Sequence, residues 1–208
     1  MLMGGPRHHS AITATEQKTG TDTAPHALPF SEISALIQDL NARLLASDSA
    51  SKALEKWCAD RHIVTNPRIS AKLLPGLYKP ATPQLRVRLD VDNKEVLRYR
   101  RVHLFCGDHL LVEADNWYVP SRLTPGMNRI LDTTDIPFGR AIGDLKPTRR
   151  TTRVNLLWSD NNIEKPLAIP ARLFDQYVAI IGKDKTPLAE VVETYCGILV
   201  ASSVGIAG

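Results

Sequence analysis

Two amphipathic segments open the patterned part of the chain. From residue 31 to about residue 46, large aliphatic side chains recur at intervals of three and four, the spacing of one face of an α-helix. A second apolar stripe covers residues 50–58. Between them, Ser47-Asp48-Ser49 supplies side-chain oxygens for the free N–H groups of the second helix, and Ser31 is placed to cap the first. We therefore predict two short helices joined by a polar turn.

After Pro67 the pattern changes to alternation, which is typical of strands with one buried and one solvated face. Alternating runs cover residues 85–91, residues 96–106 and a segment that ends at Val119, with short polar turns between them. Such connections predict an antiparallel meander. Further strands are predicted at 152–158, 174–181 and 188–199. Because helices come first and strands dominate afterwards, the fold class is α+β with an antiparallel sheet.

Two segments lack these periodic patterns. Residues 124–142 contain short apolar groups interrupted by Pro and Gly, which predicts short helical turns that cover the sheet. Residues 1–29 are rich in Thr, Ala, Gly, Ser, His and Pro and have almost no large apolar side chains. Such a composition cannot bury enough surface to offset the entropy of ordering. We therefore predict a disordered tail over 1–29 and one domain over 30–208.

Composition narrows the class of protein without selecting a function. The 208 residues include 26 Lys and Arg and 22 Asp and Glu, a net charge of +4, and only 6% aromatic residues. This mild excess without a stacking motif argues against a nucleic-acid partner. No apolar tract reaches the roughly 18 residues of a membrane span, and no export signal is indicated, so we predict a cytoplasmic protein. The three cysteines have no paired spacing and indicate neither a disulfide framework nor a zinc site.

Motifs of the common catalytic and cofactor sites are absent from the sequence. It has no glycine-rich phosphate loop, nucleophile elbow, zinc-binding helix or acidic calcium loop, so we predict no cofactor and no metal. What remains is a set of arginines and a few carboxylates on predicted strands. Each is by itself typical of a solvated strand face. Arg149 and Arg150 fit either such a face or a surface that steers anions.

Four separated segments share their order and spacing with a known family. They are Leu44–Lys52, the stretch from Arg101 through Cys106-Gly107-Asp108 to Pro120, Ile136–Arg140 and Thr186–Glu193. Together they resemble the chorismate lyase (chorismate pyruvate-lyase) family. The resemblance implies a six-stranded antiparallel sheet with helices on one face and helical flaps over an internal ligand cavity. The same fold also serves as an effector-binding domain in transcription regulators, so the fold does not settle the function.

The resemblance also implies site residues. Arg101 matches the arginine that engages a substrate carboxylate, an apt partner because a guanidinium donates a charge-assisted fork to a carboxylate. Glu193 matches the functional glutamate, while Ala50 and Phe138 occupy positions whose backbone N–H groups face the ligand. Glu190 lies three residues from Glu193, so on a regular strand only one of them enters the cavity. Without the resemblance, Glu193 fits a strand glutamate paired with a surface lysine, and Phe138 fits core packing.

The activity implied is elimination of pyruvate from chorismate to give 4-hydroxybenzoate, a precursor of ubiquinone, by a cofactor-independent carbon–oxygen lyase. Arg101 and Glu193 are its expected catalytic residues, with Arg101, Phe138 and Ala50 binding the substrate, and electrostatic preorganisation is the main contribution. The alternative is a non-catalytic domain that binds a small aromatic carboxylate on the same fold. The sparse N-terminal tail has no room for a DNA-reading helix-turn-helix, which disfavours a complete regulator. The oligomeric state is left open.

Overall fold

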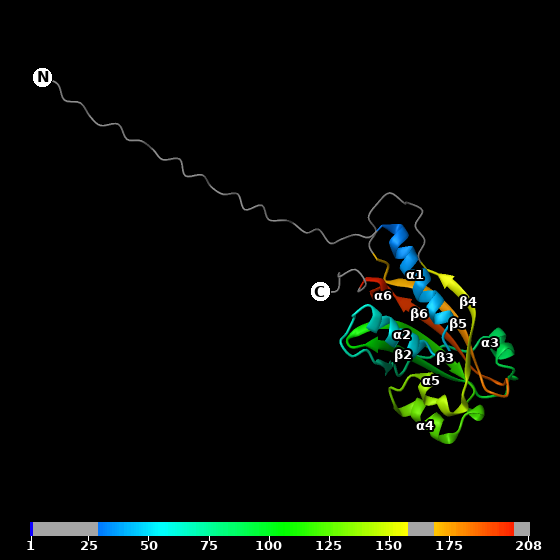
Figure 1. The fold of residues 1–208 in the computed structure, drawn as a ribbon. Helices are drawn as coiled ribbons and strands as arrows, with labels where there is room; N and C mark the ends of the chain where they lie inside the picture. Colours follow the sequence, from blue (N-terminus) through cyan, green and yellow to red (C-terminus); the bar gives the residue numbers. More distant parts are fainter. Residues whose placement is uncertain (2–28, 158–168, 202–208) are drawn as a thin grey trace.

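A six-stranded antiparallel sheet with the strand order β1-β2-β3-β6-β5-β4 forms the centre of the molecule (Figure 1). The computed structural model describes residue 1, residues 29–157 and residues 169–201, so nearly all of the predicted tail lies outside the described residues. The predicted α+β class and antiparallel sheet are confirmed.

Helices open the chain, and short helical segments separate the two groups of strands (Figure 1). In chain order the elements are α1 (Phe30–Leu45), α2 (Ala50–Asp60), β1 (Ile69–Leu73), α3 (Pro83–Arg88), β2 (Arg98–Cys106), β3 (His109–Tyr118), η1 (Pro120–Arg122), α4 (Pro125–Thr133), α5 (Phe138–Ala141), η2 (Gly143–Leu145), β4 (Thr148–Leu156), β5 (Arg172–Ile181), β6 (Pro187–Cys196) and α6 (Ile198–Ala201).

The two predicted N-terminal helices are confirmed, and the side chains that they bury are among the apolar ones that predicted them. Their buried side chains are Ile33, Ile37, Leu40 and Leu44 in α1 and Leu54, Trp57 and Cys58 in α2. Ser49 caps α2 as predicted, because its side chain accepts a hydrogen bond of 3.3 Å from the N–H of Lys52. The prediction that Ser31 caps α1 is wrong. Helix α1 begins one residue earlier, and Pro29 occupies the cap position without a side-chain hydrogen bond.

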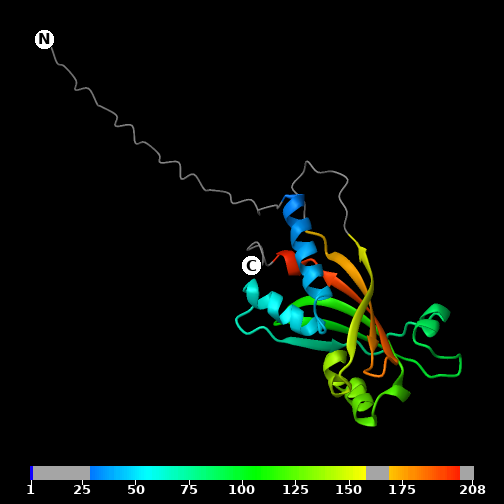
Figure 2. The same cartoon turned by 45° about the vertical axis from the view of Figure 1, so that its right-hand side comes forward.

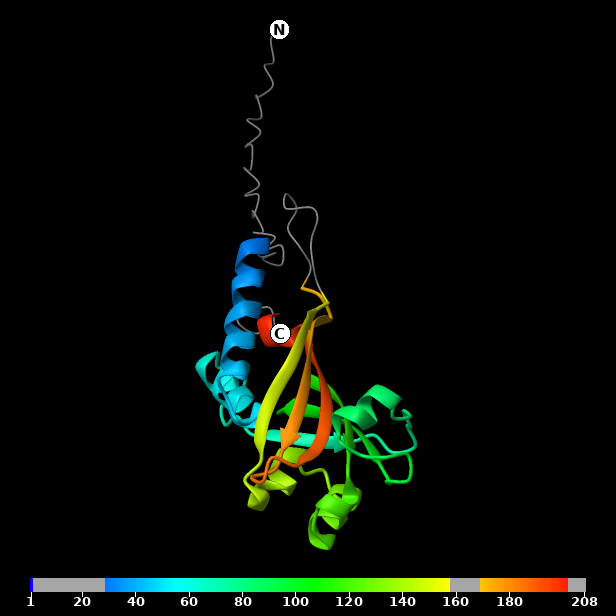
Figure 3. The ribbon, with the colours of Figure 1, turned by 90° about the vertical axis from the view of Figure 1, so that its right-hand side faces the viewer.

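The sheet carries a hydrophobic core on each of its faces. On one face, α1, α2, α4 and α5 share a core with side chains of five strands. Figure 2 shows α4 and α5 together at one end of the sheet. Figure 3 shows α3 on the opposite side of the sheet from α1 and α2. There Leu85 and Leu89 pack with Trp117 and Val119 in a second, smaller core.

The strand predicted over residues 85–91 is wrong, because this segment contains α3. Thr82 caps the helix by accepting a 3.1 Å hydrogen bond from the N–H of Leu85, and Pro83 occupies the first helical turn, where its missing N–H costs nothing. Leu85 and Leu89 are four residues apart, so both lie on one helical face, while Val87 is 78% exposed. The sixth strand is instead β1, which pairs with β2 in register from Ile69 opposite Cys106.

The other strands follow the predicted pattern with different ends. Along β2, Val102, Leu104 and Cys106 are buried and the residues between them are half-exposed, as the alternation predicts. Strand β4 begins at Thr148, four residues before its predicted start, and this brings Arg149 into the strand. Strand β6 ends at Cys196, and the last residues predicted as strand form α6.

Substitutions at Leu89 and Val87 together distinguish the observed helix from the predicted strand, because the strand would bury both side chains and the helix buries only Leu89. We expect Leu89→Ala to lower the free energy of unfolding by about 2–5 kcal/mol, because Leu89 is 1% exposed and its removal leaves a cavity in the second core. Val87→Ala is the matched control and is expected to change it by less than about 0.5 kcal/mol. Urea denaturation of both variants measures the difference, and similar losses would contradict the helix.

Candidate functional site

A cavity of about 460 Å³ lies between the sheet, the start of α2 and the segment around α5. Its inner wall comes from strands of the face that carries the larger core and is mostly apolar, with Asn116 of β3 as a polar exception beside the charged groups named below. The wall contains Val102, Leu104, Ala114, Ile180 and Val191. Polar and charged groups enter from Asp48–Lys52, Arg140, Lys146, Arg149 and Glu193. We call this space the first cavity.

A buried ion pair lies in the wall of the first cavity. Nη2 of Arg149 is 2.5 Å from Oε2 of Glu193, and the two side chains are 5% and 11% exposed. The Tyr195 hydroxyl donates a 2.7 Å hydrogen bond to the same Oε2. Nη2 of Arg149 also donates to Oε1 of Gln176 at 2.7 Å, and Gln176 donates in turn to Asn41 of α1 at 2.8 Å. The pair therefore belongs to a hydrogen-bonded network that reaches the first helix.

Electrostatics keeps Arg149 and Tyr195 of this network protonated. Burial acts to lower the pKa of Arg149, but the charge of Glu193 and the hydrogen bonds outweigh it and hold that pKa above its ordinary value. Burial and the neighbouring Glu193 charge raise the pKa of Tyr195 well above its ordinary value. Both groups therefore keep their protons at neutral pH, and neither is available as a base.

Cations without partners stand at the edge of the first cavity. Lys52 and Lys146 are exposed, and neither forms an ion pair with the residues that the structure describes. Arg140 differs, because it pairs with Glu55 at 3.2 Å. At the start of α2, the N–H groups of residues 50 and 51 have no intrahelical acceptor and carry the positive end of the helix dipole. Asp48 also lines this edge, so its three cations and two carboxylates leave a net charge of +1.

Three of the four predicted site residues meet in the first cavity. Ala50, Phe138 and Glu193 all line it. The Phe138 side chain is buried and packs against the Tyr118 ring at a centroid distance of 5.6 Å, so it also contributes to the core. Glu193 pairs with buried Arg149 rather than with a surface lysine.

Arg101, the fourth predicted site residue, lies on the opposite face of the sheet. It stands opposite Asp115 in the β2–β3 pairing, whereas Glu193 stands opposite Ala114. Asp115 and Ala114 are neighbours on β3, so their side chains, and those of their partners, face opposite sides. Glu190 is also on the Arg101 side, where Arg88 binds it at 2.7 Å. The expected convergence of Arg101 with Glu193 therefore does not occur.

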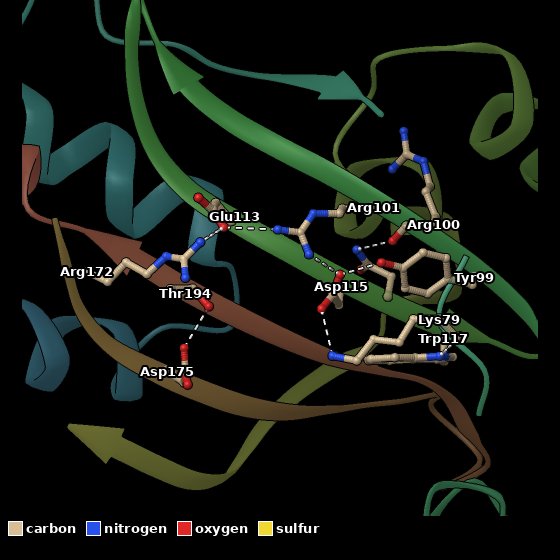
Figure 4. A network of polar contacts seen from close by, with 11 residues as sticks. Lys79, Tyr99, Arg100, Arg101, Glu113, Asp115, Trp117, Arg172, Asp175 and Thr194 are labelled. Carbon is tan, nitrogen blue, oxygen red and sulfur yellow. Dashed lines mark hydrogen bonds and ion pairs between the residues drawn. The ribbon is translucent and has the colours of Figure 1, made fainter. Parts of the chain in front are cut away.

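The Arg101 guanidinium is already bound by carboxylates of the chain itself (Figure 4). Nη1 of Arg101 donates to Asp115 and Nη2 donates to Glu113, each at 3.0 Å. Asp115 also accepts from the Tyr99 hydroxyl at 2.6 Å and from Lys79 at 3.2 Å. Burial tends to raise the pKa of Asp115, but these hydrogen bonds and the charges of Lys79 and Arg101 hold it below its ordinary value.

Arg149 is the residue of the site that the sequence patterns did not identify. Its guanidinium is neither solvated nor positioned to steer anions at the surface, because the side chain is buried against Glu193. The available signal was the alternation of β4 itself, since a strand begun at Thr148 turns Arg149 and Thr151 to one face. Within the described residues, no cluster of three or more His, Cys, Asp or Glu side chains is arranged to hold a metal ion. No described helix is both long and apolar enough to cross a membrane.

We expect Asp115→Asn to make the free energy of unfolding fall less steeply as the pH is lowered into the acidic range. The folded-state pKa of Asp115 lies below its unfolded value of about 3.9. Its ionised form therefore stabilises the fold above that pH, and this contribution is lost as the pH falls through the folded-state pKa. Urea denaturation between neutral and acidic pH measures the slope. Asp108→Asn, in the exposed β2–β3 turn, is the control; an equal slope in both variants would refute the expectation.

Arg149→Met is expected to destabilise the fold by about 3–5 kcal/mol, because it leaves the Glu193 carboxylate buried without a cation. Arg150→Met, at the exposed neighbouring position, is expected to cost less than about 0.5 kcal/mol. Equilibrium unfolding in urea compares them. Adding Glu193→Gln to Arg149→Met should restore part of the loss; a double variant no more stable than the single one would argue against the ion pair as its source.

The fold resembles the effector domain of a transcriptional regulator. The effector domain of PhnF from Mycobacterium smegmatis superposes with a TM-score of 0.50 and 14% identity, covering 73% of this chain and 90% of that domain. The possible transcriptional regulator YydK from Bacillus subtilis superposes with a TM-score of 0.41 and 16% identity. The alignment covers 61% of this chain but only 58% of YydK. At such identities the likeness extends to the fold alone.

These results correct the prediction of an enzyme. The six-stranded antiparallel sheet implied by the resemblance to chorismate lyase is confirmed, but a solved structure that superposes on it is a regulator's effector domain. The two groups expected to act on chorismate, Arg101 and Glu193, lie on opposite faces of the sheet. The predictions of a chorismate pyruvate-lyase and of a role in ubiquinone biosynthesis are therefore wrong.

Sequence comparison gives one family relationship. No protein-family model matches the sequence. The protein y4mC of Sinorhizobium fredii, described as uncharacterized, is 42% identical over 205 residues, which cover 89% of this chain and 86% of the relative. Identity at this level over most of both chains reflects common descent and a shared fold. The chain therefore belongs to the same family as Sinorhizobium fredii y4mC.

Proposed function

We propose that the chain is a non-catalytic domain that binds a small aromatic carboxylate in the first cavity. The observation that carries this proposal is the combination of a mostly apolar inner wall with two edge lysines, Lys52 and Lys146, that form no ion pair with any described residue. The volume of about 460 Å³ is within the range of roughly 300–1,000 Å³ that is typical of ligand pockets.

The two parts of the cavity suit the two parts of such a ligand. An aromatic ring gains most by packing against aliphatic walls, here formed by side chains such as Val102, Ile180 and Val191. A carboxylate gains most near cations and the N-terminus of a helix. Lys52, Lys146 and the free N–H groups of α2 supply both. The ligand would therefore lie with its ring on the sheet and its carboxylate toward α2.

The arrangement of the polar groups favours binding over turnover. The Arg149, Glu193 and Tyr195 side chains already bond to one another. Moving one of them to a ligand would leave a buried charge without its partner, which is costly. The likeness to the effector domain of PhnF also supports a binding role. We infer a preformed pocket in which these side chains form a fixed wall.

Isothermal titration calorimetry tests the proposal with 4-hydroxybenzoate and its neutral analogue 4-hydroxybenzamide. We expect 4-hydroxybenzoate to bind with a dissociation constant below about 1 mM and the amide to bind at least about tenfold more weakly, since it cannot pair with the lysines. Lys52→Ala and Lys146→Ala should each weaken carboxylate binding about fivefold. Raising the salt concentration should weaken it too.

The matched control is Lys94→Ala, an exposed lysine in the turn before β2 that lines neither the first cavity nor any other described one. It should bind like the wild type. Saturable binding that ignores Lys52 and Lys146 would contradict the proposed orientation. The absence of saturable binding for 4-hydroxybenzoate, benzoate and phenylacetate up to about 10 mM would reject the aromatic carboxylate as the ligand class.

A further inference from the structure

Arg100 is a buried cation without a carboxylate partner among the residues that the structure describes. The residue is 4% exposed. Its Nη2 donates to the backbone carbonyls of Thr134 and Ile136, at 2.9 and 3.0 Å. Its Nε and Nη1 are buried and have no acceptor. Within the described part of the chain, two neutral backbone carbonyls are thus the only hydrogen-bond acceptors of this guanidinium.

The two neighbouring arginines of β2, unlike Arg100, both form ion pairs with carboxylates. Arg98 pairs with Asp132, and Arg101 pairs with Asp115 and Glu113 on the other face. Burial lowers the pKa of Arg100, although nearby negative groups offset part of the effect. Burying a charge without a counter-charge and leaving donors unsatisfied both cost free energy. The folded chain therefore carries a cost at Arg100 that the nearby charges of Asp132 and Asp135 offset only in part.

A second cavity, of about 340 Å³, lies beside this residue. It is lined by Leu73–Tyr78, Leu97–Arg101, Tyr118, Leu131 and Asp132, and it shares no lining residue with the first cavity. The Tyr118 ring of the second cavity contacts the Phe138 ring of the first at 5.6 Å. Figure 4 shows the Arg100 side chain leaving β2 in the direction away from Arg101 and Asp115.

The charges that line the second cavity leave a positive excess. Arg98, Arg100 and Arg101 contribute to the lining, while Asp132 is its single carboxylate. Arg98 already pairs with Asp132, and the carboxylates that bind Arg101 do not line the cavity. Arg100 is therefore the cation of this lining that forms no ion pair with a described residue.

We propose that the second cavity binds a small oxyanion, which supplies the ion-pair partner that Arg100 lacks among the described residues. A carboxylate and a phosphate share this chemistry, since both present oxygens that accept charge-assisted hydrogen bonds from a guanidinium. This site is independent of the ligand proposed for the first cavity.

NMR titration of the full chain tests the proposal with two probes, inorganic phosphate and sodium acetate, at ionic strength held constant with sodium chloride. We expect one of them to shift the Arg100 Nε–H signal and the amide signals of residues 98–101 saturably, with a dissociation constant of about 1 mM or lower. A response to phosphate alone or to acetate alone distinguishes the two sources of oxyanion. No saturable shift with either, or the same shift with chloride alone, would overturn the proposal.

Arg100→Met removes the charge and should abolish the saturable amide shifts, weakening binding at least tenfold. Arg129→Met, an exposed α4 position that does not line the second cavity, is the control and should respond like the wild type. If Arg100→Met does not fold, Arg100→Gln keeps a polar side chain and serves the same comparison. Retained binding in a folded Arg100 variant would refute the site. Lys52→Ala and Lys146→Ala should leave this response unchanged, so the two proposals can fail separately.

Discussion

Position along a strand decides which side chains can meet on this sheet. Each step of one residue turns a side chain to the opposite face. The pairing of β3 with β2 and with β6 determines the face of the sheet to which Arg101 and Glu193 point. One set of side chains therefore faces α1, α2 and the first cavity, and the other faces α3 and the ion pairs of Figure 4. A reaction that needs both groups is excluded by the geometry of the strands, whatever the distance between them.

The wall of the first cavity also helps to hold α1 on the sheet. Arg149 donates to the carbonyl of Leu44 at 3.4 Å, and Gln176 donates to Asn41 at 2.8 Å. Both contacts extend from the ion pair with Glu193, so Arg149, which lines the cavity, also helps to connect α1 to the strands. Such a wall resists rearrangement, because moving either charged group leaves the other buried and unpaired. The free lysines at the edge are the groups that can adapt to a ligand.

Local sequence patterns predict most of this fold because most elements bury one face. They fail where the same residues fit both the spacing of a helix and the alternation of a strand. Leu85 and Leu89 satisfy both a strand and a helix, and only the preceding Thr82-Pro83, a cap followed by a first-turn proline, decides between them. The burial of Arg149 has no comparable local signal. Its partner Glu193 lies 44 residues later on another strand, and the pair forms only once the sheet has assembled.

Arg149 and Arg100 represent two ways to bury a guanidinium. Arg149 has its counter-charge inside the fold, so its hydrogen bonds stabilise the native state without any ligand. Among the described residues, the acceptors of Arg100 are two backbone carbonyls, both from the segment that joins α4 to α5 and leads directly to Phe138 in the first cavity. That segment therefore connects the two cavities physically. A carboxylate side chain beside Arg100 would satisfy the guanidinium permanently, and the second cavity would then have no free charge with which to hold an anion.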